Sequence, residues 1–256
     1  MSPLPPTARP GASGDGPPEG EQATFPSVVA ERVAAVRARI DAVAERVGAV
    51  RARIDALGAG RPVLIVAVTK GFGPGAVDAA ASAGITAIGE NYAHELIAKA
   101  GEGAGGERVR WHFIGAVQRN KVASLAPFVA VWQTVDRPAA AASIARHSPG
   151  ATAFVEVNLT GDAARTGCSW EDVDAVVDAA RGSGLTVVGL MGIGPPGPPR
   201  PALFARLAAT RGRLGLVELS MGMTADYEVA VAEGSTMVRL GTALFGPRTR
   251  RPDLRR

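Results

Sequence analysis

The chain has 256 residues, 46% hydrophobic and 20% charged, as in a globular protein of one large or two small domains, and we expect neither a secretory signal nor a membrane span. The net charge is +4, but residues 247–256 carry five Arg and one Asp, so the rest of the chain is neutral, which argues against nucleic-acid binding. The single cysteine, Cys168, excludes an intramolecular disulfide and favours a reducing, cytoplasmic compartment.

The predicted elements begin with a leader and a long helix. Residues 1–26 are rich in Pro, Gly and Ala and lack periodicity, which predicts a disordered leader. Apolar residues then recur at intervals of four and three, which predicts one heptad helix over 27–57, with Ser27 as N-cap and Gly58 as its end. AVRARIDA occurs in it twice, at 35–42 and 49–56. The helix either lies on the body of the domain or has a free end that pairs with a second chain, so we expect a monomer or a weak homodimer.

Strands and helices alternate after Arg61. The first predicted strand, PVLIVAV at 62–68, is a continuous apolar run, typical of a parallel sheet buried on both faces. An α/β barrel of the (β/α)8 TIM type follows from eight such strands with intervening helices. An open doubly wound sheet is the alternative, but no GxGxxG motif follows the first strand. The other predicted strands are 85–90, 109–115, 129–135, 152–159, 186–193, 216–222 and 236–241.

Lysine is rare in this sequence. Only Lys70, Lys99 and Lys121 occur among 28 basic residues, so a lysine that remains is a candidate for amine chemistry that Arg cannot supply. Lys70 directly follows the first strand, at the end where barrels build their sites, and its amine can form a Schiff base with a carbonyl. The alternative is a structural ion pair with a neighbouring strand-end carboxylate such as Glu90.

Glycines and hydroxyl residues follow strands seven and eight, where barrels often hold phosphate. The first loop contains Ser220 and Gly222, and the second contains Gly241 and Thr242. Glycine lets backbone N–H groups approach an anion and hydroxyls add donors, although both are also ordinary turn residues. A Schiff-base lysine beside a phosphate cradle indicates a phosphorylated aldehyde, and pyridoxal 5′-phosphate (PLP) is the obvious one.

Arg239, on strand eight, lies next to this predicted cradle. It could face the pyridine nitrogen of PLP, where a cation would keep that nitrogen unprotonated. The alternative is a structural ion pair with Glu218 or Asp226.

Several longer motifs carry a resemblance over about residues 30–246. They are AVTKGF (67–72), IGENYAHE (88–95), WHFIGAVQRNK (111–121), VDR (135–137), VNLTGDAARTG (157–167), GLMGI (189–193) and LSMGMTADYEVAVAEGSTMVRLGTALFG (219–246). With them the chain resembles the pyridoxal-phosphate homeostasis proteins, small relatives of the alanine racemase barrel. The resemblance implies a PLP-binding barrel over 27–246 with the cofactor on Lys70 as an internal aldimine. It further implies that the phosphate is held by Ser220, Gly241 and Thr242, that Arg239 lies near the pyridine ring, and that Asn91, His112, Asn158 and Met223 line the pocket.

Two departures from the family pattern concern other loops. Ala116 stands where the family usually has a His, and Arg165 and Thr166 stand before Gly167 where it usually keeps a Lys. These changes put in doubt any anion or partner contact that the missing His and Lys would make.

Binding PLP does not by itself imply catalysis. Racemisation needs a base on each face of the substrate carbon, and in alanine racemase, as the resemblance implies, the second base is a Tyr from another domain. This chain has only Tyr92 and Tyr227. Tyr227 is poorly placed in the helix after strand seven, and Tyr92, although closer, is more simply a surface residue at a helix N-terminus. We therefore expect a non-catalytic PLP carrier or buffer that serves PLP-dependent apo-enzymes, without metal, nucleic-acid or membrane partners. The alternatives are a racemase-like enzyme and a Schiff-base aldolase that uses Glu90 or Asp136 as acid or base.

Overall fold

The computed structural model describes residues 25–58 and 60–247. The predicted leader (1–26) and basic tail (247–256) therefore lie outside the described residues, except for positions 25, 26 and 247. The described residues belong to two compact units that divide between Arg37 and Ala38, and each unit is described by itself.

The first element, α1 (Phe25–Leu57), is the predicted long helix, but it starts two residues early, so Ser27 lies within its first turn and is not its N-cap. Pro26 is compatible with the earlier start, because proline lacks an N–H and the first turn of a helix needs none. The other end is confirmed: the helix ends before Gly58, whose N–H donates to the carbonyl of Ile54 at 2.7 Å.

The heptad stripe of α1 is buried in one unit and exposed in the other. From residue 38 onward, Val47 and Ile54 are each only 2% exposed and belong to the core of the barrel unit. Within 25–37, the stripe residues Val29, Val33 and Val36 are 43%, 45% and 52% exposed. The prediction of a helix that packs on the domain is thus confirmed for residues 38–57.

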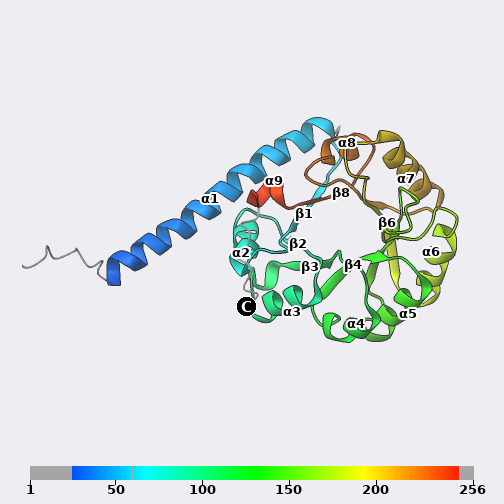
Figure 1. The fold of residues 1–256 in the computed structure, drawn as a ribbon, viewed down its shortest axis with the longest axis horizontal. Coiled ribbons are helices and arrows are strands. Elements are labelled where there is room, and N and C mark those ends of the chain that lie inside the picture. Colours follow the sequence, from blue (N-terminus) through cyan, green and yellow to red (C-terminus); the bar gives the residue numbers. More distant parts are fainter. Residues whose placement is uncertain (1–24, 59, 248–256) are drawn as a thin grey trace, which may run out of the picture. The chain divides into compact units, whose positions relative to one another are not determined.

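The second unit is a closed barrel of eight parallel strands in chain order, which confirms the predicted fold (Figure 1). The open sheet is excluded because the first strand pairs with the last, with Ile65 opposite Val238. All eight predicted strands are present, most of them one to four residues shorter than predicted. They are β1 (Leu64–Val68), β2 (Ala87–Glu90), β3 (Arg110–Phe113), β4 (Val129–Val135), β5 (Thr152–Val157), β6 (Thr186–Gly192), β7 (Glu218–Ser220) and β8 (Met237–Leu240).

Helices surround the strands as an outer ring (Figure 1). Proline begins three of them, α2, α5 and α7, as expected where no N–H is needed. The helices are α2 (Pro74–Ser82), α3 (Ala93–Gly101), α4 (Arg119–Leu125), α5 (Pro138–His147), α6 (Val173–Gly182), α7 (Pro201–Arg213), α8 (Tyr227–Ala232) and α9 (Thr242–Phe245), with a short 3-10 turn, η1 (Gly106–Arg108).

The core has two layers. The larger lies between the sheet and the helices, and the smaller fills the barrel interior with residues such as Val66, Phe154 and Met191. Because Val66 lies opposite Arg239 and Val68 lies opposite Gly89, the C-terminal ends of β8, β1 and β2 are adjacent. This edge carries the sequence-predicted lysine.

Two absences hold for the described part of the chain. Within it, no helix combines the length and apolar character that crossing a membrane requires. Residues 25–58 and 60–247 also contain no group of three or more His, Cys, Asp or Glu side chains arranged to hold a metal ion.

Candidate functional site

Lys70 lies in a tight turn at the C-terminal end of β1. The turn closes with a hydrogen bond from the Phe72 N–H to the Thr69 carbonyl at 3.0 Å. Gly71 has a φ of 74°, and a left-handed third residue is typical of a type II turn, which explains why glycine follows the lysine. Lys70 is the second residue of the turn and is half-buried.

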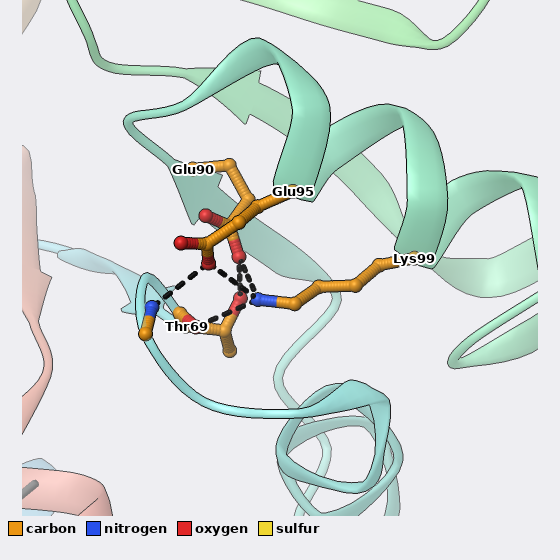
Figure 2. Close-up of polar contacts among 5 residues, drawn as sticks. Thr69, Glu90, Glu95 and Lys99 are labelled. Atoms are coloured by element: carbon orange, nitrogen blue, oxygen red, sulfur yellow. Dashed lines mark hydrogen bonds and ion pairs between the residues drawn. The ribbon is translucent and has the colours of Figure 1, made fainter. Parts of the chain in front are cut away.

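A buried ionic cluster supports this turn (Figure 2). The ammonium of Lys99, on α3, donates to Glu90 Oε1 at 2.6 Å, to the Thr69 carbonyl at 2.8 Å and to Glu95 Oε2 at 3.1 Å. The Thr69 hydroxyl donates to the same Glu90 oxygen at 2.6 Å, and the Gly71 N–H donates to Glu95 Oε2 at 2.8 Å. Burial raises the pKa of the Glu90 carboxyl, and the hydrogen bonds from Lys99 and Thr69 only partly oppose that shift.

This cluster bears on two sequence-based expectations. The sequence offers Glu90 as an ion-pair partner of Lys70 or as an acid or base beside it, and in the structure its carboxylate accepts from Lys99 and Thr69. The sequence marks Lys99 only as a rare lysine. The signal for its role was the four-residue spacing from Glu95, which favours an ion pair on one helix face.

A row of polar side chains crosses the barrel interior from β8 to β3. The Arg239 guanidinium donates to the Ser220 hydroxyl at 2.7 Å, and that hydroxyl donates to Gln133 Oε1 at 2.7 Å. Gln133 Nε2 in turn lies 2.8 Å from His112 Nδ1. An amide nitrogen only donates, so His112 accepts through Nδ1 as the neutral ring. Burial agrees with this assignment, since it lowers the pKa of His112 to about 4.

The structure therefore brings together three predicted site residues, Arg239, Ser220 and His112, through Gln133, which the sequence did not indicate. Arg239 also donates to the backbone carbonyls of Ser220 and Gly192, at 2.8 and 2.9 Å. Its hydrogen bonds thus go to these groups rather than to Glu218 or Asp226, the acids weighed as its structural partners. Burial lowers the pKa of Arg239 to about 10, so it remains a cation at neutral pH.

The loops after β7 and β8 are joined by a hydrogen bond from the Ala243 N–H to the Thr224 hydroxyl at 3.2 Å. This contact places Thr224, a residue that sequence reasoning missed, beside the predicted pair Gly241 and Thr242. A Cβ added to Gly241 would lie 3.3 Å from the carbonyl oxygen of Val68 on β1, so glycine permits the close approach of this loop to β1. Met223 is 37% exposed, and its N–H donates to Asp226 Oδ1 at 2.6 Å.

The two predicted asparagines have different surroundings. Asn158 folds its own loop: its amide donates to the Asp162 carbonyl at 2.8 Å, and its Oδ1 accepts from the N–H groups of Thr160 and Gly161. Asn91, after β2, has a buried Oδ1 without a hydrogen-bond partner among the described residues. It lines a cavity of about 330 Å³ between the β2 and β3 loops, together with His94, Ala116, Gln118 and Lys121.

Comparison with known proteins identifies the family. Residues 39–249 match the alanine racemase N-terminal domain family. A pyridoxal phosphate homeostasis protein of Pseudomonas aeruginosa is 37% identical over 235 residues, covering 87% of this chain and 96% of that protein. The chain belongs to the pyridoxal phosphate homeostasis protein family.

Solved structures agree with this assignment. PipY of Synechococcus elongatus, a structure with PLP bound, has a TM-score of 0.70 at 31% identity, covering 80% of this chain and all of that one. Alanine racemase of Corynebacterium glutamicum has a TM-score of 0.61 at 19% identity, covering 81% of this chain and 61% of that one, and shows a shared fold. Of the two departures from the homeostasis-protein pattern, Ala116 lines the cavity beside Asn91, and Arg165 donates twice to the Gly194 carbonyl at 3.2 Å.

Proposed function

We propose that this chain binds PLP through the amine of Lys70 and serves PLP homeostasis as a carrier or buffer. The observation that carries the proposal is the position of Lys70, in a turn at the end of β1. The neighbouring strand, β8, holds the buried cation Arg239. The chain's family membership and the PLP-bound structure of PipY support it.

The donors at this edge fit the chemistry of PLP. Lys70 supplies an amine for the aldehyde, with loss of one water, and Arg239 supplies a permanent cation for the ring. Thr224, Thr242 and the backbone around Gly241 supply donors suited to a phosphate. The Ser220 hydroxyl already bonds to Arg239 and Gln133, so we assign it first to orienting Arg239. His112, Asn91, Asn158 and Met223 stay predicted neighbours of the cofactor.

We infer that this protein has little or no catalytic turnover, because the candidate acids and bases among the described residues are poorly suited to that role. PLP, when bound, supplies a reactive aldehyde and an electron-withdrawing ring, and turnover also requires a positioned acid or base. Tyr92 is 54% exposed, and burial together with Glu228 raises the pKa of Tyr227. Glu90 is bound by Lys99, and Asp136 pairs with Arg137 at 2.6 Å, so no observation favours the aldolase alternative.

The first test uses the fact that the chain has only three lysines. Purified protein is mixed with PLP, its visible spectrum is recorded, the product is reduced with borohydride, and the labelled peptide is mapped. We expect a yellow product, reduced onto Lys70 and absent from Lys70→Ala, with Lys121→Ala as the matched control that still loads. A colourless wild type, or unchanged loading of Lys70→Ala, would overturn the assignment.

A second test separates a carrier from an enzyme. The loaded protein is incubated with a PLP-dependent apo-enzyme, and recovery of that enzyme's activity is followed alongside racemase assays on a panel of amino acids. We expect transfer of PLP without amino-acid turnover. Turnover that exceeds free PLP and disappears in Lys70→Ala would show a racemase-like enzyme instead. The cytoplasmic location remains a prediction from the single cysteine.

We propose that the protein is a monomer or forms a weak homodimer through the exposed stripe of Val29, Val33 and Val36. Arg32 and Arg37 flank this stripe, so pairing two copies would bring like charges together. We therefore expect any dimer seen by analytical ultracentrifugation to grow with salt, which screens the repulsion, and to vanish in Val33→Glu. A dimer that survives Val33→Glu would place the contact elsewhere.

A further inference from the structure

The buried cluster beneath the Lys70 turn has a geometry that a general stabilising role does not explain. Its hydrogen bonds reach both peptide groups that flank the Cα of Lys70. The Thr69 carbonyl belongs to the preceding peptide and accepts from Lys99 at 2.8 Å, and the Gly71 N–H belongs to the following peptide and donates to Glu95 at 2.8 Å. These two peptide planes set φ and ψ of Lys70, and thereby the direction in which its side chain leaves the backbone.

The two groups that hold these peptides come from one helix and bind each other. Glu95 and Lys99 are one turn apart on α3, with 3.1 Å between carboxylate and ammonium (Figure 2). Glu90, which is fully buried at the end of β2, accepts from both Lys99 and Thr69. The three protons of the ammonium thus meet three acceptors, which leaves none unsatisfied.

This geometry also explains why position 99 is one of only three lysines among the 28 basic residues of the chain. Three acceptors surround one nitrogen within 3.1 Å, which suits a compact ammonium with three rotatable donors. A planar guanidinium would spread its donors over a fork and could not point them at one centre. Lys99 is only 5% exposed, so the larger group would also lack space.

We propose that Lys99 and Glu95 are positioning residues that fix the backbone on both sides of Lys70 and so orient its amine toward the aldehyde of PLP. The proposal rests on the proposed function of Lys70. Neither residue is assigned contact with the cofactor. Their effect is on the rate at which the covalent bond forms, since a small misplacement of a reacting group slows a reaction strongly.

The test centres on Glu95→Ala, because Glu95 is partly exposed and its loss leaves the buried pair Lys99 and Glu90 in place. Glu95→Gln retains an oxygen acceptor for the Gly71 N–H and serves as the rescue. Asp78→Ala is the matched control, because Asp78 accepts from the Gly105 N–H at 2.7 Å, an equivalent carboxylate–glycine bond in another loop.

Two quantities are measured on each full-length variant. The first is amide hydrogen exchange at Gly71 in the absence of PLP, expected to be roughly tenfold faster in Glu95→Ala. The second is the first-order rate of covalent loading at saturating PLP, expected to fall about tenfold or more. Glu95→Gln should recover most of both, and Asp78→Ala should change neither.

The outcomes distinguish the two proposals. Wild-type protein that does not bind PLP at Lys70 would overturn the proposed function and the positioning role with it. Wild type that loads normally, together with Glu95→Ala that loads at the same rate or shows unchanged exchange at Gly71, would overturn the positioning role alone. Slower loading in Glu95→Ala with equal slowing in Asp78→Ala would also overturn it, since the effect would then be a general loss of stability.

Discussion

The described part of the chain contains two buried cations, Lys99 and Arg239, whose hydrogen-bond partners differ in charge. Lys99, behind β1 and β2, meets two carboxylates and one carbonyl, so its charge is neutralised where it lies. Arg239, inside the barrel, donates only to neutral oxygens of Ser220 and Gly192. The acidic group that acts on it most strongly, Glu156, raises its pKa without a direct bond between them, and burial outweighs that effect.

The difference between their partners indicates that the two cations have different roles. A fully paired ammonium has no charge left for a ligand, and it instead fixes the groups that it binds, here the backbone beside Lys70. A guanidinium held by carbonyls and a hydroxyl is fixed in orientation but keeps its charge for an electron-rich partner. This difference supports the proposals that Lys99 positions the backbone of the site and that Arg239 faces the cofactor.

Removing the paired cation should have the largest effect on stability. In Lys99→Met the Glu90 carboxylate stays buried without its partner, so we expect a loss of about 3–5 kcal/mol in the free energy of unfolding near neutral pH. The pKa of Glu90 is already raised by burial and would rise further in the variant. The variant should thus recover part of its stability as the pH falls and Glu90 takes up a proton.

Urea unfolding of wild type and Lys99→Met at about pH 5 and pH 8 measures both effects. A loss of equal size at the two pH values would show that the ammonium acts by packing rather than by charge. Lys99→Arg serves as the control that keeps the charge and changes the shape.

Removing the unpaired cation should have a smaller effect on stability and a larger one on PLP. Arg239→Met leaves the Ser220 and Gly192 oxygens without their donor, so we expect about 1.5–3 kcal/mol of destabilisation. PLP affinity is measured by titrating the visible absorbance. For each kcal/mol of stability lost, Arg239→Met should lose more PLP affinity than Lys99→Met does. The comparison fails if Lys99→Met weakens PLP binding as strongly while the protein remains folded.

The fold was predictable from the sequence, because it depends on local patterns. Buried parallel strands are continuous apolar runs, and eight of them with intervening helices closed into the expected barrel. The position of Lys70 followed from the same reasoning, since it directly follows the first run. The predicted start of α1 was wrong by two residues: Ser27 was predicted as the N-cap, but the helix begins at Phe25. Serine is a common N-cap, yet the first turn of a helix also accepts a proline such as Pro26.

Contacts across the barrel were not predictable, because no local pattern encodes them. Gln133 and Ser220 are 87 residues apart in sequence, and their hydrogen bond joins β4 to β7. The sequence places Ser220 in a glycine-containing loop suited to phosphate, and this role stays a prediction; the structure adds that Ser220 is the last residue of β7 and is fully buried. The ion pair of Glu90 with Lys99 likewise depends on how α3 packs on β2.

A substitution of Glu156 tests whether a nearby carboxylate stabilises the charge of Arg239, and it leaves both Lys99 and Arg239 unchanged. Its Oε1 accepts from the Thr166 hydroxyl at 2.6 Å, its Oε2 is buried without a hydrogen-bond partner among the described residues, and burial raises its pKa. A carboxyl with a raised folded-state pKa contributes stability at acid pH, and this contribution is lost as the pH rises through that pKa. Glu156→Gln should therefore gain stability relative to wild type as the pH rises.

Urea unfolding over about pH 5 to 9 tests this expectation. If Arg239 draws significant stabilisation from Glu156, the gain will be small or reversed, and Arg239 would then resemble Lys99 more than we infer. Asp174→Asn is the control variant: Arg213 lowers the pKa of Asp174 below its ordinary value, so Asp174 stays ionised from pH 5 to 9 and the variant should show no pH-dependent change relative to wild type.

The smallest effect is expected from an ion pair whose geometry is as good as that of Lys99 but which lies in solvent. Arg213 donates to both oxygens of Asp174, at 2.6 and 2.8 Å, and both side chains are at least half exposed. Water and salt screen such a pair, so Arg213→Met should unfold within experimental error of wild type in urea. A loss comparable to that of Lys99→Met would mean that pairing geometry rather than burial sets the contribution of each cation, and the distinction between Lys99 and Arg239 would then lose its physical basis.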